Sequence, residues 1–222
     1  MDFATARRMM VDSQVRTSDV TNLQLISAML EIPRECFVPA ANADIAYLDR
    51  DVPVSDPPEG RLSRRLLKPM VLGKLIQSAE VQSADRVLDV ACATGYSSAI
   101  LARLASEVVA LEEDKDLADR ARQILGDVGT ANVTVVHGSL VAGWPDLGPY
   151  DVVFVNGRSE VVPQELCRQL RNRGRLVGVF GEGMAAKAMM YLSEAGEVSG
   201  RMLFDAAAPL LPGFAKPPAF VF

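Results

Sequence analysis

The chain has 222 residues, of which 49% are hydrophobic and 23% are charged, and its formal net charge is −5. This size and composition predict one globular domain, and the acidic balance supplies no general affinity for nucleic-acid phosphates. One histidine and three widely spaced cysteines exclude a His-rich metal centre, a disulfide framework and a Ser/His triad, so we expect no bound metal.

The first 85 residues predict a helical region. Apolar side chains recur at helical spacing in residues 3–10, 23–30 and 71–76. Pro53, Pro57, Pro58 and Gly60 interrupt this pattern and predict a loop of about 15 residues, a length that favours a functional role. We expect residues 1–80 to form a helical N-terminal extension that packs on a core formed by residues 81–222.

The sequence predicts neither a membrane span nor a signal peptide. The longest apolar stretches have about six residues, against the roughly 20 that a bilayer requires. The N-terminal residues MDFATARRMMVDSQVR contain no apolar core of the kind that a signal peptide needs. We therefore expect a cytoplasmic protein without a membrane partner.

From residue 86 onward, short β-branched runs alternate with helical patterns. This alternation is typical of βα units and predicts a doubly wound, Rossmann-like α/β fold with a parallel sheet buried on both faces. The last apolar runs, at residues 202–204 and 219–222 around the Pro-rich stretch LLPGFAKPP, predict a closing antiparallel hairpin. The predicted parallel strands are residues 86–91, 107–111, 132–136, 151–155 and 175–180.

The stretch VLDVACATGYSSAILA, residues 87–102, is the most informative part of the sequence. A strand that ends in an acid, followed by small residues and a helix, lets the backbone approach a nucleotide at the carboxyl end of the strand. Asp89 is that acid, and Glu112 ends the second strand, where its carboxylate could accept both hydroxyls of a ribose. The structural alternatives are a helix cap for Asp89 and a solvated strand-end acid for Glu112.

This stretch resembles the VLDVGCGTGY motif of class I S-adenosylmethionine-dependent methyltransferases. Residues 5–180 also resemble the protein-L-isoaspartate O-methyltransferase family, through IPRECFVP, LLKPMVLGKLI, LEED, NVTVVHGS, PYDVVFVNG and GRLVGV. The resemblance implies S-adenosyl-L-methionine as cofactor and carboxyl O-methylation of isoaspartyl residues in damaged proteins, or of a related carboxylic acid. It implies these cofactor-binding residues: Asp89, Ala91, Ala93, Gly95, Tyr96, Glu112, Ser139 and Leu140.

The chain departs from the family at four positions. Ala91 and Ala93 replace two motif glycines, and a positive φ at either would cost about 1 kcal/mol or more with alanine. Ser139 stands where the family has an acid that contacts adenine, which weakens one charge-assisted hydrogen bond. Leu67 stands where the family's TISQP segment has its serine. These departures leave open a methyltransferase-like binding or regulatory protein with weakened cofactor binding and no isoaspartyl activity.

Basic residues surround Leu67 in the loop on the substrate side. The segment that contains Arg61, Arg64, Arg65 and Lys68 is either a clamp for an anionic peptide or a solvated turn. We expect substrate binding by Arg64, Arg65, Leu67 and Lys68, together with Asn156 at the end of the fourth strand. A carboxylate is already ionised near neutral pH, so methyl transfer to it needs no general base. The sequence assigns no catalytic residue, and the protein is expected to be a monomer or a dimer.

Overall fold

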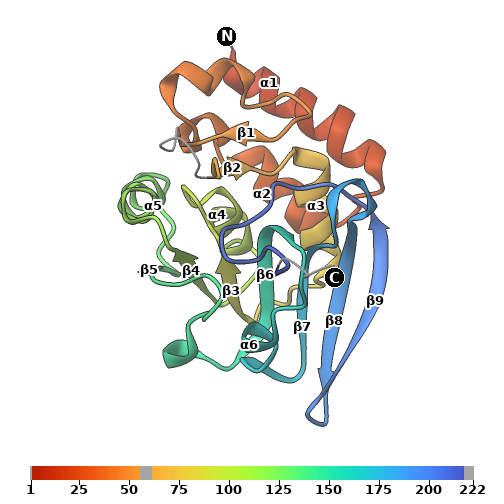
Figure 1. Cartoon of the computed structure of the whole chain (residues 1–222). Helices are drawn as coiled ribbons and strands as arrows, with labels where there is room; N and C mark the ends of the chain where they lie inside the picture. The colour runs from red at the N-terminus through yellow and green to blue at the C-terminus, as the bar shows by residue number, and fades with distance from the viewer. Residues whose placement is uncertain (1, 56–61, 218–222) are drawn as a thin grey trace.

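The computed structural model describes residues 2–55 and 62–217, and its centre is a seven-stranded sheet in the order β5-β4-β3-β6-β7-β8-β9 (Figure 1). β3 to β7 are parallel, and β8 and β9 extend the sheet in antiparallel fashion. The strands are β3 (Arg86–Val90), β4 (Glu107–Glu112), β5 (Val133–His137), β6 (Tyr150–Ser159), β7 (Leu170–Phe180), β8 (Lys187–Glu194) and β9 (Glu197–Asp205).

The five predicted parallel strands are confirmed as β3 to β7, and this is the Rossmann-like fold that the periodicity predicts. β3 lies between β4 and β6, so the chain reverses its direction of travel across the sheet at β3. In open α/β sheets, ligands bind at this switch point, beyond the carboxyl ends of the strands. The core's helical elements are α4 (Tyr96–Leu101), α5 (Lys115–Asp127), α6 (Gln164–Cys167), η5 (Pro145–Leu147) and η6 (Gly183–Ala185).

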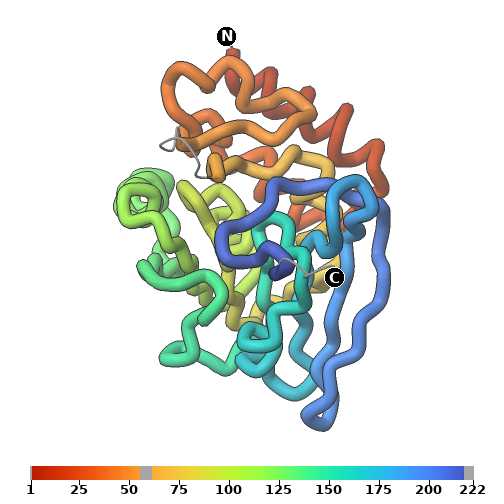
Figure 2. Tube along the Cα trace, in the orientation of Figure 1, coloured from red at the N-terminus to blue at the C-terminus, as the bar shows by residue number. Residues whose placement is uncertain are grey.

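The predicted antiparallel hairpin is confirmed, but it is formed by β8 and β9, earlier than residues 202–222. β9 is the edge strand and most of its side chains are exposed, which explains why its sequence lacks a strong apolar alternation. After β9 the chain returns to lie beside β6, where Arg158 N donates to Pro209 O at 2.7 Å and Leu211 N donates to Arg158 O at 2.9 Å (Figure 2). Residues 219–222 lie outside the described residues.

The three helices predicted in the N-terminal region are confirmed. Figure 1 shows this region over the carboxyl ends of the parallel strands. Asp2 and Asn22 begin the first two helices by accepting hydrogen bonds from backbone N–H groups of the first turn. The elements are α1 (Phe3–Met10), η1 (Val11–Val15), η2 (Arg16–Ser18), α2 (Leu23–Glu31), η3 (Arg34–Phe37), η4 (Ala40–Ile45), β1 (Val52–Pro53), β2 (Arg65–Leu66) and α3 (Pro69–Ser78).

The predicted long loop lies between β1 and β2, which pair Val52 with Leu66 and Pro53 with Arg65. This short ladder holds the residues after the loop against the N-terminal region. Pro57, Pro58, Gly60 and Arg61 lie outside the described residues.

Apolar clusters cover both faces of the sheet. One cluster packs α2, α3, α4 and α5 against it. The other contains Leu88 and Val90 of β3, Leu166 of α6, and Leu211 and Phe214 of the C-terminal segment. Both faces of the central strands β3, β4 and β6 are therefore buried, as their continuous apolar runs predict, whereas the edge strand β5 is partly exposed. Within the described ranges, no helix has the length and apolar character needed to cross a membrane.

Candidate functional site

Three polar side chains lie at the carboxyl ends of the central strands. Asp89 is near the end of β3, Glu112 ends β4, and Asn156 lies in β6. They are 0%, 0% and 5% exposed, respectively. The pairing of β6 with β7 shifts register between Phe154 and Arg158, which places Asn156 in a local irregularity of the strand. Buried polar groups at a switch point make this end of the sheet the candidate site.

The loop from β3 to α4 turns through three left-handed residues. Ala91, Ala93 and Gly95 have φ values of 69°, 54° and 94°. The Ala91 and Cys92 N–H groups both donate to Leu111 O, so the loop folds toward β4. A side chain at Gly95 would place its Cβ 2.9 Å from Leu125 Cδ1, so this glycine is needed for both conformation and space. The two alanines adopt the backbone that the family's glycines favour, at a cost of about 1 kcal/mol each.

Ala91→Gly and Ala93→Gly are each expected to stabilise the protein by up to about 1 kcal/mol, because glycine removes the left-handed strain. The loss of the two methyl groups is also expected to strengthen binding of S-adenosylhomocysteine. Urea denaturation and calorimetric titration measure the two effects. Ala99→Gly, in the helix α4, is the control and is expected to destabilise by a similar amount. Destabilisation by all three substitutions would contradict the prediction.

Asp89 forms a buried cluster with the first turn of α4. The Ser97 and Ser98 hydroxyls each donate to Asp89 Oδ2 at 2.6 Å, and Asn156 Nδ2 donates to Ser97 Oγ at 2.7 Å. Within the described residues, Asp89 Oδ1 and Asn156 Oδ1 have no hydrogen-bond partner although both are buried. Burial raises the pKa of Asp89 to about 7, against the smaller opposing effect of the two serine hydroxyls. Two free acceptor oxygens suit a ligand that carries N–H donors.

The wild-type protein is expected to lose stability relative to Asp89→Asn as the pH rises from about 5 to about 8. The raised pKa means that folded Asp89 retains a proton that the unfolded chain has lost above its ordinary value of 3.8. The resulting stabilisation is complete below the pKa of Asp89 in the unfolded chain. It is lost as the pH rises through the pKa of Asp89 in the folded protein, at up to about 1.4 kcal/mol per pH unit. Urea midpoints of both proteins across this range test it, and parallel pH profiles would contradict it.

Glu112 accepts hydrogen bonds on both carboxylate oxygens. Oε1 accepts from the N–H groups of Glu113 and Asp114, at 3.0 and 3.2 Å. Oε2 accepts from Ala93 N at 2.8 Å and from Arg64 Nη2 at 2.9 Å. The guanidinium of Arg64 also donates to Ala91 O at 2.8 Å. The predicted ribose acceptor is therefore paired with a residue that the sequence places on the substrate side.

The remaining residues predicted to bind the cofactor lie in different surroundings. Leu140 is fully buried, and Ser139 is exposed. The ring of Tyr96 packs against Phe37 at a centroid distance of 5.4 Å and lies under the Arg34 guanidinium. Tyr96 therefore joins the site loop to the N-terminal region.

The residues predicted to bind substrate separate into two groups. Arg64 points to Glu112, whereas Lys68 N donates to Asp51 Oδ1 and Leu67 is buried, with its carbonyl accepting from Arg34. Arg65 is partly buried in β2. Leu67 therefore lies in the packing of the N-terminal region, whereas the Arg64 side chain reaches the end of β4. The roles of Arg64, Arg65, Leu67, Lys68 and Asn156 toward a substrate stay predictions.

Four residues that build this site are not among those predicted from the sequence. Ser97 and Ser98 hold Asp89, and Thr94 Oγ1 donates to Phe37 O at 2.6 Å. Their position beside Gly95 in TGYSS was the available signal. Arg34 is fully buried and donates to Leu67 O. It lies in the IPRECFVP motif, but its burial was not predicted, because arginine is mostly found at the surface.

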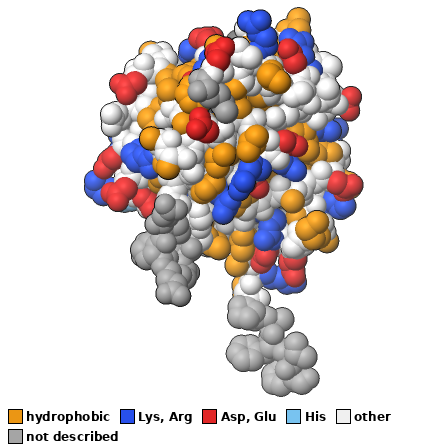
Figure 3. Space-filling view, turned by 90° about the horizontal axis from the view of Figure 1, so that it is seen from above, with side chains coloured by type: hydrophobic (Ala, Val, Ile, Leu, Met, Phe, Trp, Pro, Cys, Tyr) orange, Lys and Arg blue, Asp and Glu red, His pale blue; other side chains and the backbone are white. Residues whose placement is uncertain are grey.

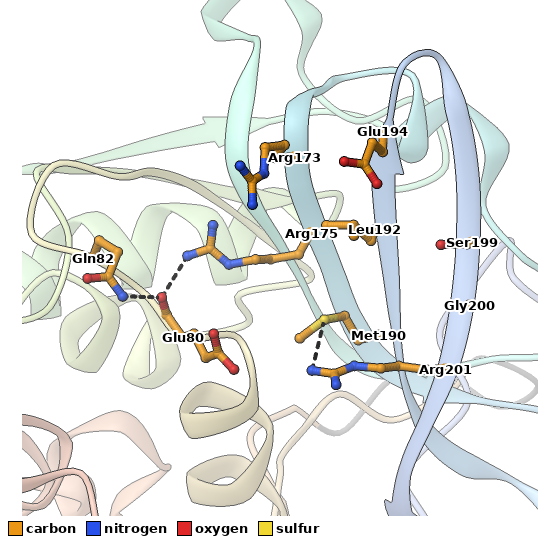
Figure 4. Close-up of a pocket in the computed structure, with 10 residues that line it drawn as sticks. All are labelled: Glu80, Gln82, Arg173, Arg175, Met190, Leu192, Glu194, Ser199, Gly200 and Arg201. Atoms are coloured by element: carbon orange, nitrogen blue, oxygen red, sulfur yellow. Dashed lines mark hydrogen bonds between the residues drawn. The ribbon is translucent and has the colours of Figure 1, made fainter.

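A separate surface feature lies away from this site. A groove of about 690 Å³ runs between the residues after α3 and the strands β7 to β9 (Figure 4). Its Arg175 bonds to Asp85 Oδ2 at 2.6 Å and to the carbonyls of Ala79 and Glu80, so this arginine has a structural role. None of the residues that line the groove belongs to the predicted site.

Two further observations concern the surface above the site and the side chains that could bind a metal. Viewed from the end that carries the N-terminal region, the visible surface mixes apolar side chains with charges of both signs (Figure 3). In the part of the chain that the structure describes, no group of three or more His, Cys, Asp or Glu side chains is placed to hold a metal ion.

The chain is similar in sequence to proteins of one family. The model of the family "Protein-L-isoaspartate(D-aspartate) O-methyltransferase" matches residues 6–205. A protein-L-isoaspartate O-methyltransferase of Methanoculleus marisnigri is 36% identical over 175 residues, which are 79% of this chain and 77% of the relative. One from Roseiflexus sp. is 31% identical over 217 residues, covering 97% of this chain and 96% of the relative.

Solved structures show the same fold. A protein-L-isoaspartate O-methyltransferase superposes with a TM-score of 0.79 at 23% identity, covering 93% of this chain and 66% of that one. A Plasmodium falciparum structure, described as a putative protein-L-isoaspartate O-methyltransferase in complex with S-adenosyl-L-homocysteine, gives a TM-score of 0.74 at 18% identity, covering 92% of this chain and 97% of that one. By the match of its sequence over residues 6–205, this chain belongs to the protein-L-isoaspartate(D-aspartate) O-methyltransferase family.

Proposed function

We propose that the protein is an S-adenosylmethionine-dependent carboxyl O-methyltransferase that acts in the cytoplasm on isoaspartyl residues of damaged proteins and peptides. The observation that carries this proposal is the set of buried acceptors at the switch point, Asp89, Glu112 and Asn156, in a chain of this family. Such a set suits a ligand that carries hydroxyl and ammonium donors.

The acceptor oxygens of the site suit the cofactor's donors, whereas the methyl groups of Ala91 and Ala93 and the ion pair of Glu112 oppose its binding. Glu112 would hold the ribose, and the unpartnered oxygens of Asp89 and Asn156 would accept from the amino group. The loop from Ala91 to Tyr96 would line the cofactor, with Ser139 and Leu140 beside the adenine. When bound, the cofactor supplies an electrophilic methyl group on its sulfonium.

The isoaspartyl carboxylate that accepts the methyl group needs to be oriented, but it does not need a general base to remove a proton. It is ionised near neutral pH, so the protein can act by aligning it and by excluding water. We propose that residues 1–80 supply this substrate side, with Arg65, Leu67 and Lys68 near the peptide, and that residues 81–222 hold the cofactor. The N-terminal region lies over the carboxyl ends of the strands, which supports this division (Figure 1).

A methylation assay with two matched peptides tests the function. One peptide contains isoaspartate and the other contains aspartate at the same position, and both are incubated with S-adenosylmethionine labelled in its methyl group. We expect base-labile methyl ester on the isoaspartyl peptide alone. Binding of S-adenosylhomocysteine without methylation of either peptide would indicate another acceptor.

A second candidate function is a methyltransferase-like binding protein without isoaspartyl activity. It is favoured by the left-handed Ala91 and Ala93, and by the ion pair that already occupies Glu112. The two functions differ in cofactor binding, so calorimetric titration with S-adenosylhomocysteine separates them. Failure to bind at millimolar concentration would favour the second function.

A further inference from the structure

Arg64 joins the N-terminal region to the candidate cofactor site. It precedes β2 and is 7% exposed, and its Nη2 donates to both Glu112 Oε2 and Ala91 O. Its backbone is held by the residue that follows β1, because Arg64 O accepts from Val54 N at 2.9 Å. The side chain therefore reaches from one part of the fold into the other.

The hydrogen bonds of Glu112 leave no room for another donor. A carboxylate offers about four lone-pair positions, and Glu112 accepts from four N–H groups. Three of these are backbone groups of the site's own loops, at Ala93, Glu113 and Asp114. Only the fourth donor, Arg64, belongs to a side chain that can move away by rotation.

The arginine is itself incompletely bonded. Its Nε is buried without a hydrogen-bond partner in the described part of the chain, and only Nη2 contacts Glu112 and Ala91. A guanidinium has five N–H donors, and a buried ion pair is stable only when its remaining donors are also satisfied. The free-energy cost of moving Arg64 away from Glu112 is therefore smaller than it would be for an arginine whose donors are all hydrogen-bonded.

We propose that Arg64 is an intramolecular competitor of the cofactor, whose ribose reaches Glu112 only after the arginine has left it. This inference rests on the proposed function and concerns the regulation of the same site. In the ligand-free state Arg64 donates to Glu112 Oε2. When the arginine side chain leaves, the carboxylate is free to bind the ribose. A competitor that leaves a fraction f of molecules competent raises the apparent Kd by 1/f.

Calorimetric titration with S-adenosylhomocysteine tests the competition. Arg64→Met removes the competing charge and keeps much of the side-chain volume, and we expect it to bind at least about tenfold more tightly than the wild type. Arg64→Gln, which is also neutral, is expected to change affinity in the same direction and serves if the methionine variant does not fold. Arg122→Met, which removes the same charge from an exposed position of α5, is expected to bind like the wild type.

A second measurement follows Arg64 itself. Its Nε–H is buried, so its NMR resonance is expected to be protected from exchange in the ligand-free wild type and absent from Arg64→Met. Addition of S-adenosylhomocysteine is expected to remove this protection.

The outcomes separate the two proposals. Equal or weaker binding by both Arg64 variants would overturn the competition while the proposed function stood. Retained protection in the ligand complex would also overturn it. Failure of every protein, wild type included, to bind at millimolar ligand would overturn the proposed function and the competition with it.

Discussion

Glu112→Gln is expected to weaken binding of S-adenosylhomocysteine by roughly 30- to 100-fold. The carboxylate would accept from the ribose at the position that Arg64 vacates, and a hydrogen bond to a charged group contributes about 1.5–3 kcal/mol. Glutamine keeps one acceptor oxygen and loses the charge, so we expect a loss of about 2–3 kcal/mol, where each 1.4 kcal/mol is tenfold. Calorimetric titration measures the change.

Glu107→Gln is the matched control for this prediction. Glu107 begins the same strand, β4, and pairs with Arg86 at the opposite end of the sheet. We expect its substitution to leave the affinity unchanged. Equal affinity of Glu112→Gln and the wild type would show that this carboxylate does not hold the ribose.

Arg34→Met is expected to destabilise the protein by about 2–5 kcal/mol, because two buried carbonyls lose their donors. Arg34 is fully buried, with Nε donating to Ala46 O at 2.7 Å and Nη2 donating to Leu67 O at 2.8 Å. Methionine fills part of the volume but leaves both carbonyls without these donors, at about 1–3 kcal/mol each. It also removes the guanidinium from the ring of Tyr96, 4.7 Å away.

Urea denaturation measures the stability of Arg34→Met. Arg8→Met, at an exposed position of α1, is the control and is expected to change the free energy of unfolding by less than about 0.5 kcal/mol. Arg34→Lys keeps the charge and one donor group, so an intermediate loss is expected. A loss below about 1 kcal/mol for the methionine variant would mean that the network adds little to stability.

The elements could be predicted because their patterns are local. The runs that became β3, β4 and β6 are buried on both faces, and such strands have continuous apolar sequences. Asp89 and Glu112 could be placed at one edge of the sheet because parallel strands bring their carboxyl ends together. β9 could not be predicted in this way, since an exposed edge strand imposes little apolar order on its sequence.

The sequence predicted the position of the site loop, but it did not predict whether the backbone at Ala91 and Ala93 has a positive φ. The sequence indicates a small-residue turn, and it cannot say whether alanine adopts a left-handed conformation there. In the structure Ala91 and Ala93 do so, because β4 accepts hydrogen bonds from the loop and Glu112 accepts from Ala93 N. These contacts offset the strain of the two residues.

The sequence by itself determined the fold class, the family and the strand ends at which Asp89 and Glu112 lie, because each depends on short-range patterns of apolar and small residues. Only the tertiary structure decided the partner of Glu112 and the burial of Arg34. Arg64 and Glu112 are 48 positions apart and meet because the N-terminal region packs over the carboxyl ends of the strands. No local pattern determines such a contact, since it depends on how two segments distant in the sequence pack against each other.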